Sequence, residues 1–154
     1  MIPAIVTKLL ATWALIFALA PLEAPVKPWE PDPADVALIS RTIWGEARGC
    51  SQIEQEAVGW CILNRVDDSR FPNTIEGVVT AKNQFSGFSW NFPADVFEDM
   101  AKGLLIRWHN GEHGIPTDLV FFRSDGYGHN TFYSECFGGH TYTWENMMEN
   151  DSGD

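Results

Sequence analysis

The sequence predicts an α+β fold that is mostly helical, with a small antiparallel β element near the C-terminus. Apolar residues recur at helical spacing in several segments between residues 33 and 109. After residue 119, short runs rich in aromatic and β-branched residues alternate with glycines. A chain of 154 residues, 45% of them hydrophobic, is long enough to bury one core, so we expect a single folded domain.

The N-terminal segment, residues 1–22, differs from the rest of the chain. Residues 9–22 carry no charge, and the stretch is shorter than the roughly 18 to 20 residues that span a bilayer. This pattern is typical of a signal-peptide core, and residues 18–20 (Ala-Leu-Ala) have the small-x-small form of a cleavage site. Pro21 fits cleavage poorly, which leaves a retained membrane anchor open; a buried N-terminal helix is the other alternative. We expect export to the periplasm, the cell envelope or the extracellular space.

A proline-rich linker, residues 23–32, precedes the domain that we place at 33–144. The stretch from residue 23 to residue 33 contains four prolines, which excludes a regular helix or a central strand. Asp32 can cap a helix whose first position is Pro33. A first helix is therefore predicted over residues 33–48, with a core stripe that shares helical spacing: Val36, Ile39, Ile43 and Ala47.

The second helix begins at the capping box that Ser51 and Glu54 form, and its wide apolar face indicates a helix largely buried. The remaining elements are expected in chain order: a short helix at 74–81, an irregular recognition loop at 83–92, a helix at 93–109, two or three short strands from Leu119 onward, and a flexible acidic tail at 145–154.

Glu46 is the first candidate for chemistry. At about 100° per residue it lies at the edge of the first helix's apolar stripe, and it falls in the last turn, where the helix dipole disfavours a negative charge. Both effects raise a carboxyl pKa, which is what a proton donor near neutral pH requires. The alternative from this argument alone is a surface glutamate paired with Arg48 or Arg41.

Five motifs in register then resemble one enzyme family. They are Ile43-Trp44-Gly45-Glu46-Ala47-Arg48-Gly49, Glu56-Ala57-Val58, Ile62-Leu63-Asn64-Arg65-Val66, Phe71-Pro72-Asn73-Thr74-Ile75 with Val78-Val79, and Gln84-Phe85-Ser86. Two fainter matches follow at Leu119-Val120-Phe121-Phe122 and Gly139-His140-Thr141-Tyr142. Together they are similar to the spore-cortex-lytic (SleB-type) cell-wall hydrolase family, over residues 35 to 142.

The resemblance implies a lysozyme-like fold and peptidoglycan as the substrate, cleaved between N-acetylmuramic acid and N-acetylglucosamine. It makes Glu46 the general acid, with the carbohydrate captured by its own C6 hydroxyl as in a lytic transglycosylase. It also implies substrate contacts in the later motifs: Gln84, Phe85, Ser86, His140 and Tyr142. Loop packing is the alternative for the first two, and turn stabilisation for His140. No cofactor or metal is implied, and we expect a monomer.

The sequence departs from the family at Cys50, where an acidic residue is usual, and at Glu54-Gln55, where a Gly-Gln pair is usual. Both positions are expected at the rim of the substrate cleft, so the resemblance does not extend to recognition of spore cortex in particular. Two other functions remain open on these residues: a non-catalytic wall-binding or lysis-accessory protein with the same fold, and a wall-degrading endolysin of a virus.

Other candidate groups have plain structural explanations. His109 and His113 are four residues apart, but Asn110-Gly111 breaks the helix that would align them on a metal. The three cysteines, Cys50, Cys61 and Cys136, allow one disulfide without indicating which; a cysteine nucleophile with His140 as base is the less favoured alternative. Three tryptophans either stack on sugar rings or pack in the core: Trp44, Trp90 and Trp144.

The composition also bears on partners. The chain has 10 Lys and Arg against 21 Asp and Glu, a net charge of −11. Proteins that bind nucleic acid through its phosphates need clustered basic residues, so nucleic acid is not an expected partner. Aromatic residues make up 13% of the chain, which favours flat, uncharged ligands such as sugars.

Overall fold

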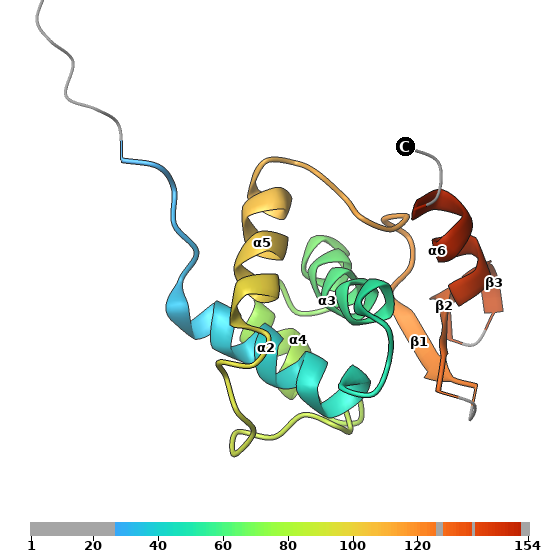
Figure 1. The fold of residues 1–154 in the computed structure, drawn as a ribbon, viewed down its shortest axis with the longest axis horizontal. Coiled ribbons are helices and arrows are strands. Elements are labelled where there is room, and N and C mark those ends of the chain that lie inside the picture. Colours follow the sequence, from blue (N-terminus) through green and yellow to red (C-terminus); the bar gives the residue numbers. More distant parts are fainter. Residues whose placement is uncertain (1–26, 126–127, 137, 152–154) are drawn as a thin grey trace, which may run out of the picture.

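The structure, a computed structural model, describes residues 27–125, 128–136 and 138–151. Figure 1 shows the helices α2 (Pro33–Ala47), α3 (Gln52–Asp67), α4 (Ile75–Thr80), α5 (Glu98–His109) and α6 (Trp144–Asp151), and the strands β1 (Phe121–Ser124), β2 (Asn130–Glu135) and β3 (Gly138–Tyr142). The predicted α+β class is confirmed. The proposed signal or anchor segment and residues 23–26 of the linker lie outside the described residues. In the part of the chain that is described, no helix has the length and apolar character to cross a membrane.

The first helix forms where its capping residues predict. The Asp32 side chain accepts a hydrogen bond from the Ala34 amide at 2.8 Å, and Pro33 occupies the first turn. The predicted core stripe is buried along its length. The helix ends at Ala47, one residue before the predicted boundary.

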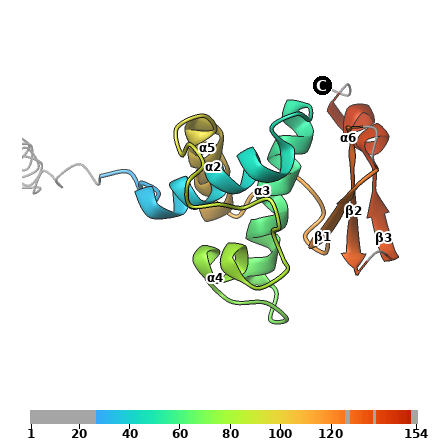
Figure 2. The same ribbon diagram turned by 90° about the horizontal axis from the view of Figure 1, so that it is seen from below.

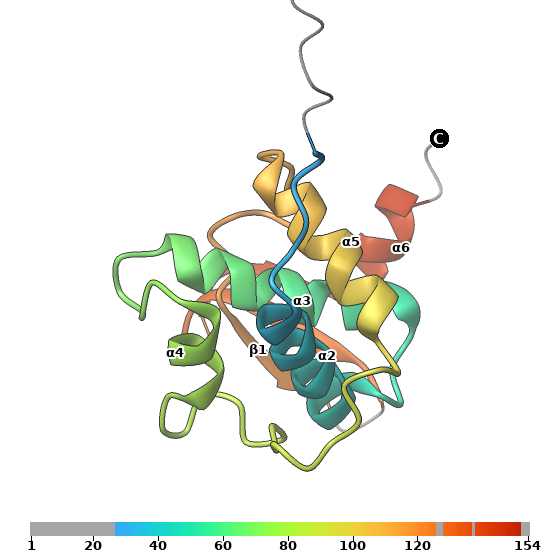
Figure 3. The same cartoon turned by 90° about the vertical axis from the view of Figure 1, so that its left-hand side faces the viewer.

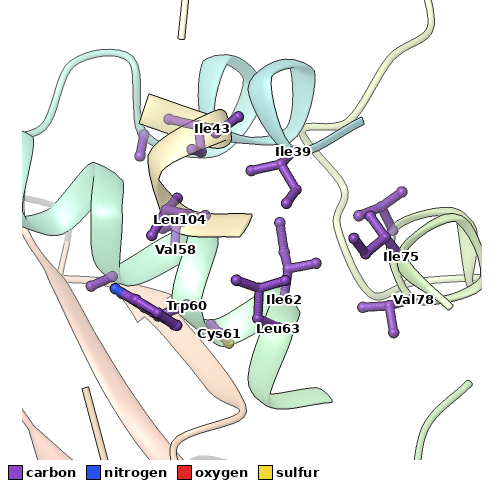
Figure 4. Packing of buried hydrophobic residues seen from close by; sticks show 14 of the residues in the cluster. Ile39, Ile43, Val58, Trp60, Cys61, Ile62, Leu63, Ile75, Val78 and Leu104 are labelled. Carbon is purple, nitrogen blue, oxygen red and sulfur yellow. The ribbon is translucent and has the colours of Figure 1, made fainter. Parts of the chain in front are cut away.

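Helix α3 is the centre of the molecule, since all four other helices and β1 pack against it. The Ser51–Glu54 capping box is present at its N-terminus, as predicted. Residues 57–65 are all buried, which explains the wide apolar face. Figure 4 shows α3 residues such as Trp60 and Ile62 packed among side chains of α2, α4 and α5.

Helix α5 begins five residues later than predicted. The sequence favours a helix from Pro93, but the structure has irregular chain up to Phe97 and a helix only from Glu98. The reason is tertiary: the Phe97 amide donates to the Ser40 hydroxyl of α2 at 3.2 Å, so this segment is held against α2. The Phe97 carbonyl then accepts the bond from Ala101 that opens the helix.

The sheet is antiparallel in the order β1-β2-β3, and it lies on one side of α3 with α2 and α5 on the other (Figure 2). Phe122, Phe132 and Tyr142 are aligned across the three strands and pack against the core, with Phe132 fully buried. β3 is the outer strand, on the side of the sheet away from α2 (Figures 1 and 2).

Residues 145–151 differ from the expectation of a flexible tail at 145–154, and residues 152–154 lie outside the described residues. Residues 144–151 form α6, and Met147 is buried in the core cluster. Thr143 starts the helix, because its amide and hydroxyl both donate to the Asn146 side chain. The acidic composition of this segment predicted a flexible tail, whereas the segment forms a short amphipathic helix that packs on the core through Met147.

Candidate active site

Glu46 lies in the last turn of α2 and is half-buried. Its neighbours along the core stripe, Ile43 and Ala47, are buried, which places the carboxyl at the edge of the core as the helical arithmetic predicts. Arg48 does not pair with it: the Arg48 guanidinium donates to the carbonyls of Trp44 and Gly45 and so closes the C-terminal end of the helix.

The loop after α4 crosses this end of α2 (Figure 3) and supplies the carboxyl with a hydrogen-bond donor. The Gly87 amide donates to Glu46 Oε1 at 2.6 Å. Two glycines permit this approach. A Cβ built on Gly45 would lie 1.8 Å from the Gly87 carbonyl oxygen, and one built on Gly87 would lie 2.6 Å from the Gly45 oxygen. Backbone meets backbone here, so neither glycine can carry a side chain without separating the two segments.

Three influences act on the acidity of Glu46. Burial is the largest and raises the pKa of the carboxyl above its ordinary value. The hydrogen bond from Gly87 and the charge of Arg65 each lower it, but the net shift remains upward. The carboxyl therefore holds its proton more strongly than an exposed glutamate does, while its charged form has two stabilising neighbours.

Arg65 is the cation of this site, and its surroundings are unusual. Its residue is only 3% exposed, and its guanidinium carbon lies 4.6 to 5.4 Å from the ring centroids of Phe71, Phe85 and Phe121. No carboxylate lies within ion-pair distance of it in the described part of the chain. Instead, an aromatic cage holds the charge near Glu46 without direct contact.

The predicted substrate residues of the loop gather around Arg65. Gln84 Oε1 accepts a hydrogen bond from the Arg65 guanidinium at 3.0 Å. Phe85 is buried and forms one wall of the aromatic cage. Ser86 is exposed and lies between Phe85 and Gly87. The structure thus gives Gln84 and Phe85 the packing role that the sequence left as their alternative, and their contact with substrate stays a prediction.

His140 and Tyr142 lie apart from Glu46, on the outer strand β3. His140 Nδ1 is 3.1 Å from the Asp118 carboxylate, and its amide donates to Ser134. Tyr142 borders a different hollow, beside Trp60 of α3. Among the interactions of the described residues, neither of the two contacts Glu46, and their role as substrate contacts stays a prediction.

Four aspartates are candidates for a second carboxylate, although no sequence motif assigns any of them that role: Asp35, Asp67, Asp68 and Asp95. Asp67 accepts a hydrogen bond from the Trp108 indole, and Asp68 is bound by Arg70. Among the interactions of the described residues, none of the four aspartates contacts Glu46.

Glu54 is a buried carboxylate whose wider role the sequence did not reveal. It is 0% exposed and accepts hydrogen bonds from the Asn130 amide at 2.8 Å and the Ser51 hydroxyl at 2.8 Å, and His129 lies 3.2 Å away. Burial alone raises the pKa of Glu54, but these hydrogen bonds outweigh it and hold the pKa below its ordinary value. The residue joins the start of α3 to β2, and it is sealed from substrate.

All three cysteines are free thiols in the structure, so the one disulfide that the sequence allows is not formed there. Burial raises the pKa of Cys61 to about 12, so its thiol stays protonated. Burial and the charge of Glu54 also raise the pKa of Cys50.

The two histidines considered for metal binding have aromatic neighbours instead: His109 stacks on Trp29 and His113 faces Trp60. The described residues hold no group of three or more metal-ligating side chains.

Comparison with known proteins agrees with the resemblance found in the sequence. A family model described as Cell Wall Hydrolase matches residues 49–144. Among curated proteins, a spore cortex-lytic enzyme of Bacillus cereus is 40% identical over 91 residues, which is 59% of this chain and 35% of that protein. A spore cortex-lytic enzyme of Oceanobacillus iheyensis is 32% identical over 95 residues, which is 59% of this chain and 33% of that protein. A spore cortex-lytic enzyme of Bacillus subtilis is 27% identical over 95 residues, which is 59% of this chain and 30% of that protein.

The chain spans about a third of the length of these relatives. No solved structure matches it. The lysozyme-like fold that the resemblance implies therefore stays a prediction, beside a confirmed α+β architecture.

Proposed function

The chain belongs to the cell wall hydrolase family, and we propose that it cleaves the β-1,4 bond between N-acetylmuramic acid and N-acetylglucosamine in peptidoglycan, with Glu46 as general acid. The observation that carries the proposal is the half-buried Glu46 carboxyl, whose pKa burial raises and whose Oε1 is held by the Gly87 amide. The relatives named as spore cortex-lytic enzymes support the substrate class.

The first step is proton donation to the bridging oxygen. Glu46 gives its proton to the oxygen of the leaving N-acetylglucosamine, the bond from that oxygen to the muramic C1 breaks, and positive charge develops on the muramic ring. Because burial raises the pKa of Glu46, a larger fraction of this carboxyl stays protonated at a given pH than of an exposed glutamate, and the protonated form is the state that this step consumes.

The neighbours of Glu46 act on the carboxylate that this step leaves behind. The Gly87 amide and the charge of Arg65 favour the ionised form, so they stabilise the negative charge as it appears. Arg65 is held by Gln84 and an aromatic cage, so its charge acts on Glu46 through space and not through an ion pair.

We further propose that the second step forms a 1,6-anhydro product, as in a lytic transglycosylase. The Glu46 carboxylate takes the proton of the muramic C6 hydroxyl, and that oxygen bonds to C1, which restores the acid and consumes no water. Ordinary retaining and inverting glycosidases need a second carboxylate at a defined distance. No motif of the sequence assigns such a partner to Glu46, which favours the one-acid route.

The substitution Glu46→Gln tests the assignment. The amide keeps the shape and still accepts the Gly87 hydrogen bond, but it has no proton to give, so release of sugar from purified peptidoglycan should stop while the fold persists. Glu112→Gln, at an exposed glutamate beyond α5, is the matched control and should keep full activity. If the Glu46→Gln protein still solubilises the wall, Glu46 is not the acid.

Mass spectrometry of the released fragments separates the two chemistries, because an anhydro end is one water lighter than a hydrolysed end. A wild-type protein that binds the wall and releases nothing would instead favour the non-catalytic wall-binding protein. We also propose export through residues 1–22, because the substrate lies outside the cytoplasmic membrane; mass analysis of the mature protein distinguishes cleavage from a retained anchor.

A further inference from the structure

We infer that a hollow of about 420 Å3 between the end of α4 and the 83–92 loop binds a sugar ring of the glycan strand, stacked on Trp90. The inference rests on the proposed function, since it names a subsite for the same substrate. The hollow is lined by Phe85 and Phe88, the residues that flank Gly87 on the chain. Gly87 lies between these two residues on the chain and donates to Glu46, so the loop that lines the hollow also contacts the proposed acid, although neither Gly87 nor Glu46 lines the hollow itself.

Trp90 differs from the other two tryptophans that the sequence left between core and ligand. Trp44 faces Phe97 with ring centroids 6.3 Å apart, and Trp144 stacks on His129 at 4.5 Å; both are partly buried. Trp90 is 56% exposed, and its described ring contact is with Phe88, at 5.2 Å and 77°. Because Phe88 contacts the Trp90 indole in an edge-to-face arrangement, part of the indole face remains uncovered.

The loop that carries Trp90 is fixed at several points, although it has no regular secondary structure. Gln84 is bonded to Arg65, Gly87 to Glu46, and the Phe92 carbonyl accepts a hydrogen bond from Arg41 of α2 at 3.1 Å. Trp90 lies between the last two anchors. A large apolar side chain displayed on an anchored loop is preorganised to bind, because little conformational entropy is lost when a ligand covers it.

The polar groups of the hollow favour a carbohydrate over other ligands. Besides the aromatic rings, hydroxyl and amide side chains line it, and one cation is present; these residues are Thr80, Asn83, Ser89, Asn91 and Lys82. A sugar ring presents an apolar face for stacking and a rim of hydroxyl and acetamido groups for hydrogen bonds. With no carboxylate and one lysine in its lining, the hollow also accepts the lactyl or peptide carboxyl that muramic acid carries.

The test measures binding without turnover, in protein that already carries Glu46→Gln. Trp90→Ala in this background should weaken binding to soluble glycan strands freed of their stem peptides about ten-fold, the scale of one lost aromatic contact. Trp90→Phe should retain most of the affinity, because a flat face remains. Trp29→Ala is the matched control: Trp29 is also exposed, at 45%, but stacks on His109 of α5, so its loss should leave affinity unchanged.

The inference is wrong if Trp90→Ala binds the glycan strands with unchanged affinity, or if Trp90→Ala and Trp90→Phe lose affinity equally. It is also wrong if the loss of affinity appears only with intact peptidoglycan, because the hollow would then bind the stem peptide. The thermal midpoint of Trp90→Ala should match that of the parent, because the side chain is exposed. If the single variant Glu46→Gln keeps its activity, Glu46 is not the acid. That result does not decide whether Trp90 binds the glycan, because the binding measurement is independent of turnover.

Discussion

Replacing Gly87 by alanine tests whether contact between the loop and α2 sets the acidity of Glu46. The added Cβ would lie 2.6 Å from the Gly45 oxygen and 3.0 Å from the Glu46 carboxyl carbon. Because the nearest atom belongs to the backbone of α2, the loop has to retreat. The hydrogen bond to Glu46, now 2.6 Å, then lengthens or breaks.

The size of the effect follows from the bond that is lost. A hydrogen bond to a charged group contributes about 1.5 to 3 kcal/mol, so the carboxylate left by proton donation loses up to that stabilisation. We therefore expect the rate of sugar release from peptidoglycan to fall about ten- to a hundred-fold. Removing a donor that lowers the pKa of Glu46 also raises that pKa, so the loss of activity toward alkaline pH should begin at a higher pH than in the wild type.

Gly103→Ala is the matched control, because a Cβ there meets nothing within 4 Å and the position lies inside α5. Alanine favours a helix over glycine, so this variant should be slightly more stable and fully active. Our reasoning is refuted if Gly87→Ala keeps both the wild-type rate and the wild-type pH profile. It is equally refuted if Gly103→Ala loses activity to the same extent.

Three further predictions concern charge. Burial raises the folded-state pKa of Glu46, so the stability that comes from its protonation is present at low pH and is lost as the pH rises through that pKa. Glu46→Gln should therefore match or exceed the melting temperature of the wild type near neutral pH. The difference between the two melting temperatures should vanish on acidification. The pKa of Glu54 is lowered in the folded state, so the stability that Glu54 contributes is present at neutral pH and is lost as the pH falls through that pKa. Glu54→Gln weakens the hydrogen bonds from Asn130 and the other donors, and should lower the free energy of unfolding by about 1 to 3 kcal/mol in urea titrations near neutral pH. The free energy of unfolding of this variant should also decrease less steeply on acidification than that of the wild type. Gln84→Glu should form an ion pair with Arg65, reduce the field of that cation at Glu46, and move the alkaline limb of activity to higher pH; an unmoved limb would show that Arg65 does not act on Glu46.

The local features of the fold were predictable from the sequence because their causes are local. Asp32 with Pro33 and Ser51 with Glu54 mark the starts of α2 and α3 through hydrogen bonds within one turn. The edge position of Glu46 followed from helical geometry alone, and the half-buried carboxyl agrees with it.

The contacts that shape the site were not predictable, because they join distant residues without a periodic pattern. Gly87 and Glu46 are 41 residues apart, and Arg65 meets Gln84 and the Phe121 ring from other segments. Glu54 illustrates the same limit. Its role in a capping box was visible, but the hydrogen bond from Asn130, 76 residues later, was not.

The placement of Arg65 has a physical consequence for the acid. A guanidinium in direct contact with Glu46 would form an ion pair, lower the carboxyl pKa and remove the proton that the proposed reaction needs. A site with no cation would leave the newly formed carboxylate without a favourable charge nearby. The structure lies between these extremes, since Gln84 and three phenylalanine rings hold the Arg65 charge in place while the Gly87 amide donates a hydrogen bond to Glu46. In the proposed reaction one glutamate acts first as acid and afterwards as base, and both states have support: burial favours the protonated form, while the Gly87 amide and the Arg65 charge favour the ionised form.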